Sequence, residues 1–405
     1  MQFWDTSEKA KEFDFNTEKK KLIDNLNQLH SMSVEEQTLY KKWIELQEPS
    51  MIRDKAQMST YYDWQWKPTD INNKELTIKE IKELDPYVEI VEDPKEATKW
   101  TYLRKMIHTM SWTANPGRNV KIFIKDRTSG KLLGLASLAS DVTSMGVRDN
   151  YIGWSKEDKF KKGKLNYTSI ASTIVCTQPL GYNFLGGKLV AMMITTDVVR
   201  KYWKKTYGQT LVGLGTTSLY GIHSQYNGLP HFKTLGESKG KISIKPDDEF
   251  YTPWHQWLKE NRADWYKDAI TNERIRNGEN MGLGSGASGP VSGIKQKILS
   301  KIFKECGIKQ SEYHHGFRRG VYLAMMYENG NEFLRSEIDE SELVMKKKFE
   351  DDVEYINNWW KKKAIKRYTK LYEQSKLKPE HLFYVDGIDT SWDEFKQKRL
   401  NEVGR

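Results

Sequence analysis

Cysteine is scarce in this sequence: 405 residues include only Cys176 and Cys306. Two cysteines this far apart build neither a disulfide framework nor a four-cysteine zinc site, which favours a reducing compartment. Long apolar runs are also missing. The longest lies around residues 189–194, far short of the ~20 residues that a membrane span needs. The first residues lack the basic and then apolar layout of a signal peptide, so we expect a cytoplasmic protein of two or three domains.

Acidic residues do not balance the basic ones: 65 Lys and Arg stand against 55 Asp and Glu, a formal net charge of +10. The chain also carries 14 Trp and 21 Tyr. Positive charge combined with aromatic rings suits a polyanion, and we expect DNA as the partner rather than a membrane. The alternative is a lysine-rich surface that only keeps the protein in solution.

Three regions follow one another along the chain. Residues 1–95 are typical of an N-terminal helical arm or cap, with two amphipathic helices separated near residues 31–33. Residues 96–245 change character and carry the strands. Residues 246–405 form a basic, largely helical C-terminal region. Within it, the Gly/Ser-rich stretch at 282–290 predicts a flexible loop or hinge.

Periodicity and turn signals predict the elements that lead into and build the central region. In chain order they are helices at 76–84 and 97–110, a turn at 115–117, a hairpin of strands at 120–125 and 132–138, a strand at 169–177, a helix at 186–207 and a short buried parallel strand at 211–214.

The order helix, hairpin, strand, loop, helix, strand over residues 97–214 resembles the acyl-CoA N-acyltransferase (GNAT) superfamily. The resemblance implies an α/β (α+β) fold with a mixed, mostly antiparallel central sheet flanked by helices. It also implies that the strand after the hairpin splays away from its neighbour. The loop that follows offers backbone N–H groups to a cofactor pyrophosphate at a helix N-terminus, where the helix dipole attracts anions.

In this chain that loop spans residues 178–188. Gln178 and Gly181 match the first half of the superfamily's Q/R-x-x-G-x-G/A pattern, whereas Asn183 stands where a small residue is usual. By this resemblance the donor is acetyl-CoA or another CoA-like, nucleotide-bearing molecule. Its candidate contacts are Gln178, Gly181, Tyr182, Asn183, Gly186, Gly187 and Lys188. The alternative is that the asparagine caps the helix and the glycines permit close packing.

Several short motifs support a resemblance to a more specific family. They lie at residues 134–141, 147–155, 169–193, 207–208, 234–240 and 318–335. Together they resemble the family of the Druantia anti-phage system A protein, which is itself similar to the Mom-type DNA adenine modification proteins of phages. This resemblance implies a phage- or defence-linked role in the bacterial cytoplasm. For the Mom branch it implies transfer of a carbamoylmethyl (methylcarbamoyl) group to adenine N6.

Five residues are candidates for catalysis: Asp141, Asp149, Tyr220, Tyr226 and His223. Either aspartate can accept the proton of an attacking amine, but for Asp149 we favour the alternative of a turn residue paired with Arg148. The two tyrosines follow the last strand, where GNAT-like enzymes often protonate the leaving thiolate. The histidine suits a base, a DNA contact or a surface position. We interpret Cys176 as a small buried hydrophobic residue rather than a nucleophile.

Contacts to DNA are expected where arginines and lysines cluster with aromatic residues. The candidates are Arg148, His314, Arg318, Arg319, Lys361, Lys362, Lys363 and Arg367. The adjacent His314 and His315 point apart on a helix or a strand, so no metal site is expected. For the lysines after Trp359 and Trp360, the alternative is an ordinary amphipathic helix with buried tryptophans and solvated lysines.

The sequence therefore predicts a GNAT-like transferase that places a small acyl-type or carbamoylmethyl group on a DNA base amine, with adenine N6 as the expected target. The alternative is a non-catalytic DNA-binding component of a phage defence or counter-defence complex. We do not favour a two-metal nuclease, because the sequence contains no convincing cluster of the carboxylates that such an enzyme needs.

Overall fold

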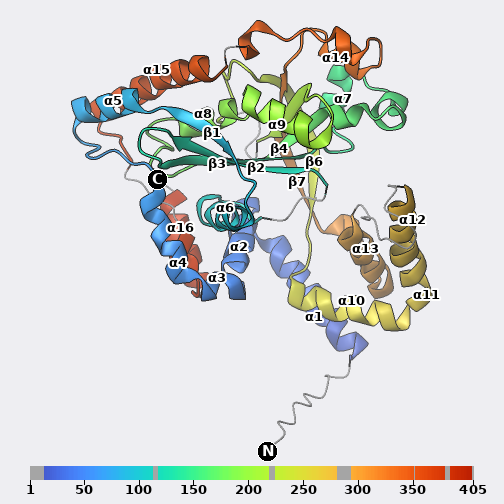
Figure 1. Ribbon diagram of the computed structural model, residues 1–405. Helices are drawn as coiled ribbons and strands as arrows, with labels where there is room; N and C mark the ends of the chain where they lie inside the picture. The colour runs from blue at the N-terminus through green and yellow to red at the C-terminus, as the bar shows by residue number, and fades with distance from the viewer. Residues whose placement is uncertain are drawn as a thin grey trace, which may run out of the picture. The chain divides into compact units, whose positions relative to one another are not determined.

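The structure is a computed structural model that describes residues 13–112, 117–218, 224–280, 293–350, 352–378 and 384–403. The chain forms two compact units (Figure 1). Unit 1 comprises Met1–Gln37 and Lys241–Phe317, and unit 2 comprises Thr38–Gly240 and Arg318–Arg405. Each unit therefore combines stretches that are distant in sequence.

Unit 1 is helical. Its helices are α1 (Phe15–Ser31), α10 (Asp248–Asn261), α11 (Ala263–Tyr266), α12 (Glu273–Asn280) and α13 (Ile294–Cys306). Asp14 caps α1 by accepting a 2.7 Å hydrogen bond from the backbone N–H of Thr17. The rings of Phe13 and Phe15 each meet the Trp254 ring edge to face at 5.0 Å. Because α2 (Val34–Leu46) begins directly after α1, the two helices predicted around residues 31–33 are confirmed.

The other helices belong to unit 2. They are α3 (Pro49–Arg53), α4 (Lys55–Thr60), α5 (Lys74–Glu83), α6 (Pro94–Ile107), α7 (Gly146–Ile152), α8 (Gly186–Met193), α9 (Asp197–Tyr207), α14 (Gly330–Leu334), α15 (Asp352–Glu373) and α16 (Trp392–Val403). Helices α5 and α6 confirm the two predicted ahead of the hairpin.

A seven-stranded mixed sheet forms the centre of unit 2, in the order β1-β2-β3-β4-β5-β7-β6. The strands are β1 (Pro86–Ile90), β2 (Asn119–Asp126), β3 (Leu132–Ser140), β4 (Thr168–Cys176), β5 (Gly213–Thr217), β6 (Lys233–Ser243) and β7 (His314–Met325). The pairs β1/β2, β2/β3, β3/β4 and β5/β7 are antiparallel, whereas β4/β5 is parallel. The predicted fold class, hairpin and third strand are confirmed.

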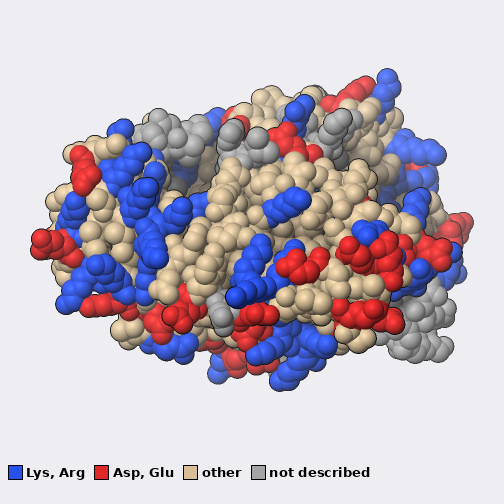
Figure 2. All heavy atoms as spheres, turned by 90° about the horizontal axis from the view of Figure 1, so that it is seen from above, with Lys and Arg blue, Asp and Glu red and all other residues tan. Residues whose placement is uncertain are grey.

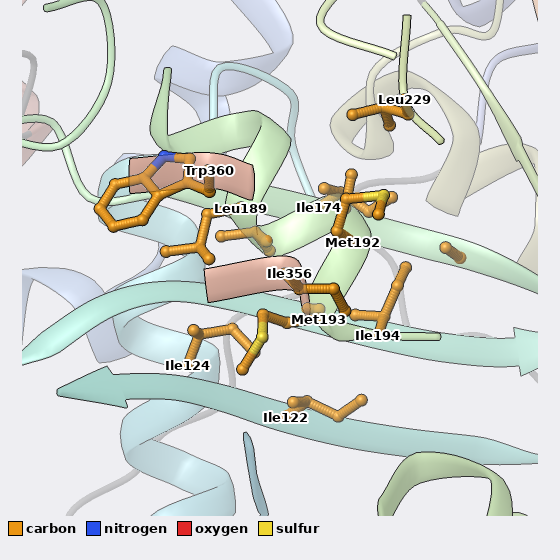
Figure 3. Packing of buried hydrophobic residues seen from close by; sticks show 14 of the residues in the cluster. Ile122, Ile124, Ile174, Leu189, Met192, Met193, Ile194, Leu229, Ile356 and Trp360 are labelled. Atoms are coloured by element: carbon orange, nitrogen blue, oxygen red, sulfur yellow. The ribbon is translucent and has the colours of Figure 1, made fainter. Parts of the chain in front are cut away.

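Both faces of the hairpin are buried. Successive side chains of a strand point to opposite faces, so Ile122 and Ile124 share one face and Phe123 lies on the other. Figure 3 shows Ile124 beside Met193 of α8, and Trp360 of α15 belongs to the same cluster on the far side of Leu189. Helix α6 covers the opposite face (Figure 1). Unit 2 therefore has helices on both sides of its sheet.

The helix predicted at 186–207 is wrong in one respect: α8 ends at Met193 and α9 begins at Asp197. The Thr196 hydroxyl donates to the Met193 carbonyl at 2.8 Å, and its backbone is extended. A β-branched residue whose hydroxyl binds the backbone in this way favours a helix boundary. Buried residues of both helices belong to one hydrophobic cluster, which explains why the periodicity looked unbroken.

Strand β7 is a second correction, because the C-terminal hundred residues were expected to be helical. The strand predicted at 211–214 is present with a short shift, as β5, and it is parallel to β4 as expected. Two predictions lie outside the described residues. These are most of the turn at 115–117 and the Gly/Ser-rich loop at 282–290.

Candidate functional site

Strands β4 and β5 part in the middle of the sheet. Their parallel pairing covers only three residues of β4, from Thr168 to Ile170, opposite Gly213 to Gly215. Strand β4 continues to Cys176 paired with β3, while β5 pairs along its whole length with β7. The splayed arrangement that the resemblance implied is therefore present.

A cavity of about 960 Å³ lies at this opening. Its wall is formed by the outer half of β4, the end of β5, the segment at 224–227 and the end of α6. The polar lining residues are Arg104, His108, Thr109, Ser111, Ser172, Thr173, Gln178, Thr216, Thr217, Ser218, Ser224, Gln225, Tyr226, Asn227 and Arg319. This lining, as far as the structure describes it, contains two arginines and no Asp or Glu. The cavity is therefore suited to an anion.

A β-bulge adds polarity to the β4 wall. Ser137 and Leu138 of β3 pair with Thr173 and Ala171, so Ser172 is the extra residue. Its hydroxyl lies 2.8 Å from that of Ser137, and its side chain is exposed to the cavity. Bulges next to active sites redirect backbone and side-chain groups out of the ladder. Ser172 is a site residue that the periodicity of the strand did not reveal.

Tyr226 is the candidate catalytic residue that the structure places in the cavity wall. Its ring meets that of Tyr322 at 5.2 Å, and burial raises the pKa of its phenol. The Tyr322 hydroxyl accepts from Ser224 at 2.8 Å and donates to Asn227 at 2.9 Å, which fixes this wall. Tyr226 is therefore held in its protonated form. Tyr220 and His223 lie outside the described residues.

His108 also lines the cavity, at the C-terminal end of α6. Its Nδ1 accepts a 3.0 Å hydrogen bond from the backbone N–H of Met110. Burial and the neighbouring charges of Arg104 and Lys42 lower the pKa of the imidazole well below its ordinary value. The ring is therefore neutral, with its proton on Nε2. Sequence reasoning missed it because a single histidine after a helix carries no motif.

The predicted donor loop uses much of its hydrogen-bonding capacity internally. The N–H groups of Gly181, Gly186 and Lys188 donate to carbonyls within the loop at 2.8–3.0 Å. The Gly187 N–H bonds to the Cys176 thiol, whose pKa burial raises to about 12. Cys176 is thus a poor nucleophile, as expected. Of the predicted donor contacts, Gln178 lines the cavity.

Asn183 and Tyr182 face the C-terminal part of the chain. The Asn183 side chain donates to the carbonyl of Lys378 at 2.7 Å and accepts from its N–H at 3.1 Å. The exposed Tyr182 ring lies 4.6 Å from the Arg367 guanidinium and 4.8 Å from the Lys378 ammonium. Lys188 donates to the carbonyl of Gln225 at 2.9 Å, which ties the start of α8 to the cavity wall.

Asp141, Asp149 and Arg148 form a buried ion-pair group with Lys159. The arginine lies 2.5 Å from the first carboxylate and 2.6 Å from the second, and Lys159 lies 2.6 Å from Asp149. Burial raises the pKa of Asp141; at Asp149 burial acts the same way, but the two cations outweigh it and lower the pKa. None of the four lines the cavity as described. Arg148 is 1% exposed, so it lies away from solvent.

The predicted DNA contacts are distributed over several elements. Along β7, Arg319 lines the cavity, whereas Arg318 is 75% exposed and lies 3.5 Å from Glu237. His314 is half-buried and belongs to unit 1. Lys361 donates to the Lys82 carbonyl at 2.8 Å.

Helix α15 buries its tryptophans and exposes its lysines. Trp360 is fully buried and donates to the Phe184 carbonyl at 3.0 Å, while Trp359 is half-buried. Lys362 and Lys363 are exposed, and Arg367 is half-buried. Figure 2 shows basic side chains gathered at the left of the view, where α15 lies in Figure 1. The helix is therefore amphipathic, with a positively charged outer face.

Among the described residues, no group of three or more His, Cys, Asp or Glu could hold a metal ion. Within the same residues, every helix is too short or too polar to cross a membrane.

Fold and site together define a mixed α/β protein whose sheet opens between two parallel strands onto a cationic cavity. A family model described as "DruA: Druantia protein DruA" matches residues 37–336, and the chain belongs to this family. All residues that line the cavity fall within the match, whereas α15 lies beyond it.

A curated relative, Druantia protein DruA of Escherichia coli (strain UMEA 4076-1), is 25% identical over 249 residues. The alignment covers 56% of this chain and 56% of that protein, so the chain spans little more than half of its relative's length. No solved structure matches the chain.

Proposed function

We propose that this protein acts in anti-phage defence as a DNA base modification enzyme. In this proposal it moves a small acyl-type or carbamoylmethyl group from a nucleotide-bearing donor to a base amine, with adenine N6 as the target. The observation that carries the proposal is the large polar cavity where β4 and β5 part. Family membership supports the defence role, and the positive charge of the chain supports DNA as the substrate.

The residues present fit a donor that bears phosphate. The cavity volume of about 960 Å³ is at the upper end of that of ordinary cofactor sites, and two arginines line it. The amides of Gly181, Gly186 and Gly187 already have partners, which favours the cavity wall over the α8 loop as the donor's anion site. Gln178 and Ser172 lie where they can hydrogen-bond the remainder of the donor.

Tyr226 supplies the acid in this mechanism. A thioester donor offers a carbonyl carbon that a base amine attacks, forming a C–N bond as the C–S bond breaks. Tyr226 gives its proton to the leaving sulfur, and the proton released by the amine replaces it, so no net proton is consumed. The raised pKa of the phenol keeps that proton in place until it is needed.

One set of observations favours a second function, a DNA-binding component of a defence complex without catalysis. The paired carboxylates Asp141 and Asp149 do not line the described cavity, and Asn183 holds the C-terminal segment instead of leaving room for a phosphate. A protein that keeps this fold but no longer binds a donor retains only the basic surface and the cavity.

Nucleoside mass spectrometry distinguishes the two functions. DNA from cells that express the protein, digested to nucleosides, is expected to contain a mass-shifted deoxyadenosine that vector-only cells lack. Tyr226→Phe keeps the ring packing against Tyr322 and is expected to lower the yield by about 10²-fold or more, the usual size of an acid–base contribution.

Tyr87→Phe, which removes a phenol hydroxyl that bonds Glu89 and does not line the cavity, is the matched control and is expected to retain most of the modification. Unmodified DNA from cells that contain folded, soluble protein would refute the enzyme. Salt-sensitive DNA binding by that same protein would then identify the non-catalytic component.

A further inference from the structure

Arg104 is a buried cation with no carboxylate at ion-pair distance among the described residues, although the charge of Glu45 acts on it from farther away. Arg104 is 4% exposed and lines the cavity from the last turn of α6. One guanidinium nitrogen donates to the Met110 carbonyl, and its Nε meets no acceptor in the part of the chain that the structure describes. Burying a guanidinium without a counterion is costly, so an anion close to it would be stabilising.

The charge of Glu45 favours the charged form of Arg104, but the oxygens of Glu45 and Glu48 bond directly to other groups. Glu45 bonds to Lys42 at 2.6 Å and to the backbone N–H of Trp112 at 2.5 Å. Glu48 pairs with Lys105 at 2.6 Å. The region behind the cavity thus holds three cations against these two carboxylates, and Arg104 is the cation of the three that lines the cavity.

Arg319 brings a second guanidinium to the same cavity from β7. Its neighbour Arg318 lies on the solvent side with Glu237, so the alternation of the strand selects which arginine enters. Burial lowers the pKa of Arg319 from its ordinary value, as expected for a cation turned away from bulk water. The two arginines come from elements more than two hundred residues apart in sequence.

We propose that Arg104 and Arg319 form a phosphate-binding site within the cavity. The guanidinium fork matches the oxygens of a phosphate, and the lining hydroxyls can complete their hydrogen bonds. The proposal deepens the proposed function by assigning the donor's phosphate to the arginines rather than to the loop before α8. The same chemistry also fits a phosphodiester of nucleic acid that enters the cavity.

Isothermal titration of the full-length protein tests the site with three probes: inorganic pyrophosphate, coenzyme A and a short single-stranded oligonucleotide. We expect at least one probe to bind saturably. Arg319→Gln is expected to raise its Kd by about 10-fold or more, as for loss of a charge-assisted hydrogen bond. Arg318→Gln, which removes the same charge one residue away, is the matched control: it is expected to leave the Kd for pyrophosphate and coenzyme A unchanged and to weaken oligonucleotide binding less than Arg319→Gln does.

Arg104→Lys and Arg104→Gln complete the test. The lysine variant keeps the charge and is expected to retain part of the affinity, while the glutamine variant loses it. If Arg104→Gln does not fold, Arg319→Gln and the wild type still decide the matter, because Arg319 is only half-buried. Circular dichroism checks the fold of each variant.

Each pattern of binding has a defined meaning. Binding of pyrophosphate or coenzyme A that disappears in Arg319→Gln supports the site and identifies a donor phosphate. The same effect with the oligonucleotide alone supports the site and identifies a nucleic-acid phosphate. Absence of saturable binding by all three probes, or binding that neither arginine affects, overturns the proposal. Binding without any modified nucleoside would leave this site standing and remove the proposed enzyme.

Discussion

Two buried arginines in this protein have opposite roles, and their surroundings show the difference. Arg148 lies between Asp141 and Asp149, at 2.5 and 2.6 Å, and its charge is compensated. Arg104 donates to a carbonyl but has no carboxylate of this kind among the described residues. A paired buried arginine needs no further anion, whereas a buried arginine without an adjacent carboxylate points to a ligand. Sequence reasoning weighed the first as a DNA contact and overlooked the second.

His231 gives the stability of the protein a defined pH dependence. It is buried; its Nε2 lies 2.9 Å from the Lys348 carbonyl and its Nδ1 lies 2.6 Å from the Thr195 hydroxyl. Burial lowers the pKa of the imidazole to about 4. Below pH 6.5 the unfolded chain therefore binds a proton that the native protein rejects, so stability falls as the pH falls from about 6.5 to about 4. The full loss is about 3 kcal/mol.

Urea unfolding of wild type and His231→Gln between pH 8 and pH 4 measures this contribution. Subtracting the two curves of unfolding free energy against pH cancels the titrations that both proteins share. The stability difference between wild type and variant is expected to shrink toward low pH as the wild type loses stability. Parallel curves over the whole range would contradict the buried neutral imidazole. Measurements at pH 8 give the change in the free energy of unfolding that the substitution itself causes.

At the scale of the element, the start of α8 depends on two glycines for different reasons. A Cβ on Gly186 would lie 2.6 Å from the Leu180 carbonyl and 2.9 Å from the Cys176 Cβ. A Cβ on Gly187 would meet the end of the Gln225 side chain, which can move. We expect Gly186→Ala to lower the free energy of unfolding by about 1–3 kcal/mol and Gly187→Ala to lower it much less.

Chemical denaturation of the two variants compares these costs directly. Because Gln225 lines the cavity, Gly187→Ala is also expected to alter ligand binding while the fold is retained. Equal destabilisation by both substitutions would show that the loop adapts as a whole. It would also remove close packing as the reason for the glycine pair.

Local signals predicted many of the elements in the first half of the chain. The hairpin, β4 and the helices α5 and α6 follow from periodicity and turn residues, because each buries a face that its own sequence encodes. Strands β6 and β7 do not show such a pattern: the first is rich in Gly and Lys, and the second alternates only near its end. Their strand conformation depends on neighbours that are distant in sequence. The parting of two strands at the site was predictable. The presence of His108 and Arg104 in the site was not, because only the folded chain brings these residues to the cavity.

At the scale of the whole molecule, α15 provides a positively charged face that few carboxylates oppose. Residues 355–372 contain no Asp or Glu, and Glu373 at the end of this stretch pairs with Lys74 at 2.9 Å. Lys363 also lies close enough to contribute to the lowered pKa of Lys188, which burial chiefly causes. Unneutralised lysines of this kind release counterions when they bind a phosphate backbone.

A triple variant tests this face: Lys362→Gln, Lys363→Gln and Lys366→Gln. We expect weaker DNA binding and a slope of log K against log salt that is smaller in magnitude by about 2–3, or about 0.9 for each phosphate that the variant no longer neutralises. The matched control replaces Lys79, Lys162 and Lys201 by Gln, three lysines that pair with carboxylates on their own segments. Fluorescence anisotropy over a salt series measures the DNA affinity of both triple variants. Equal weakening of DNA binding in the two would show that net charge, rather than this face of α15, causes the effect.

The adjacency of Arg318 and Arg319 makes the cavity sensitive to chain length. Strand β7 pairs with β5 from Val321 onward, and side chains alternate across the sheet. Deleting or inserting one residue just before Val321 would therefore reverse the two positions, sending a solvent-facing guanidinium inward and its neighbour out. Relatives that keep the cavity are thus expected to tolerate substitutions in this stretch more readily than changes in the number of residues.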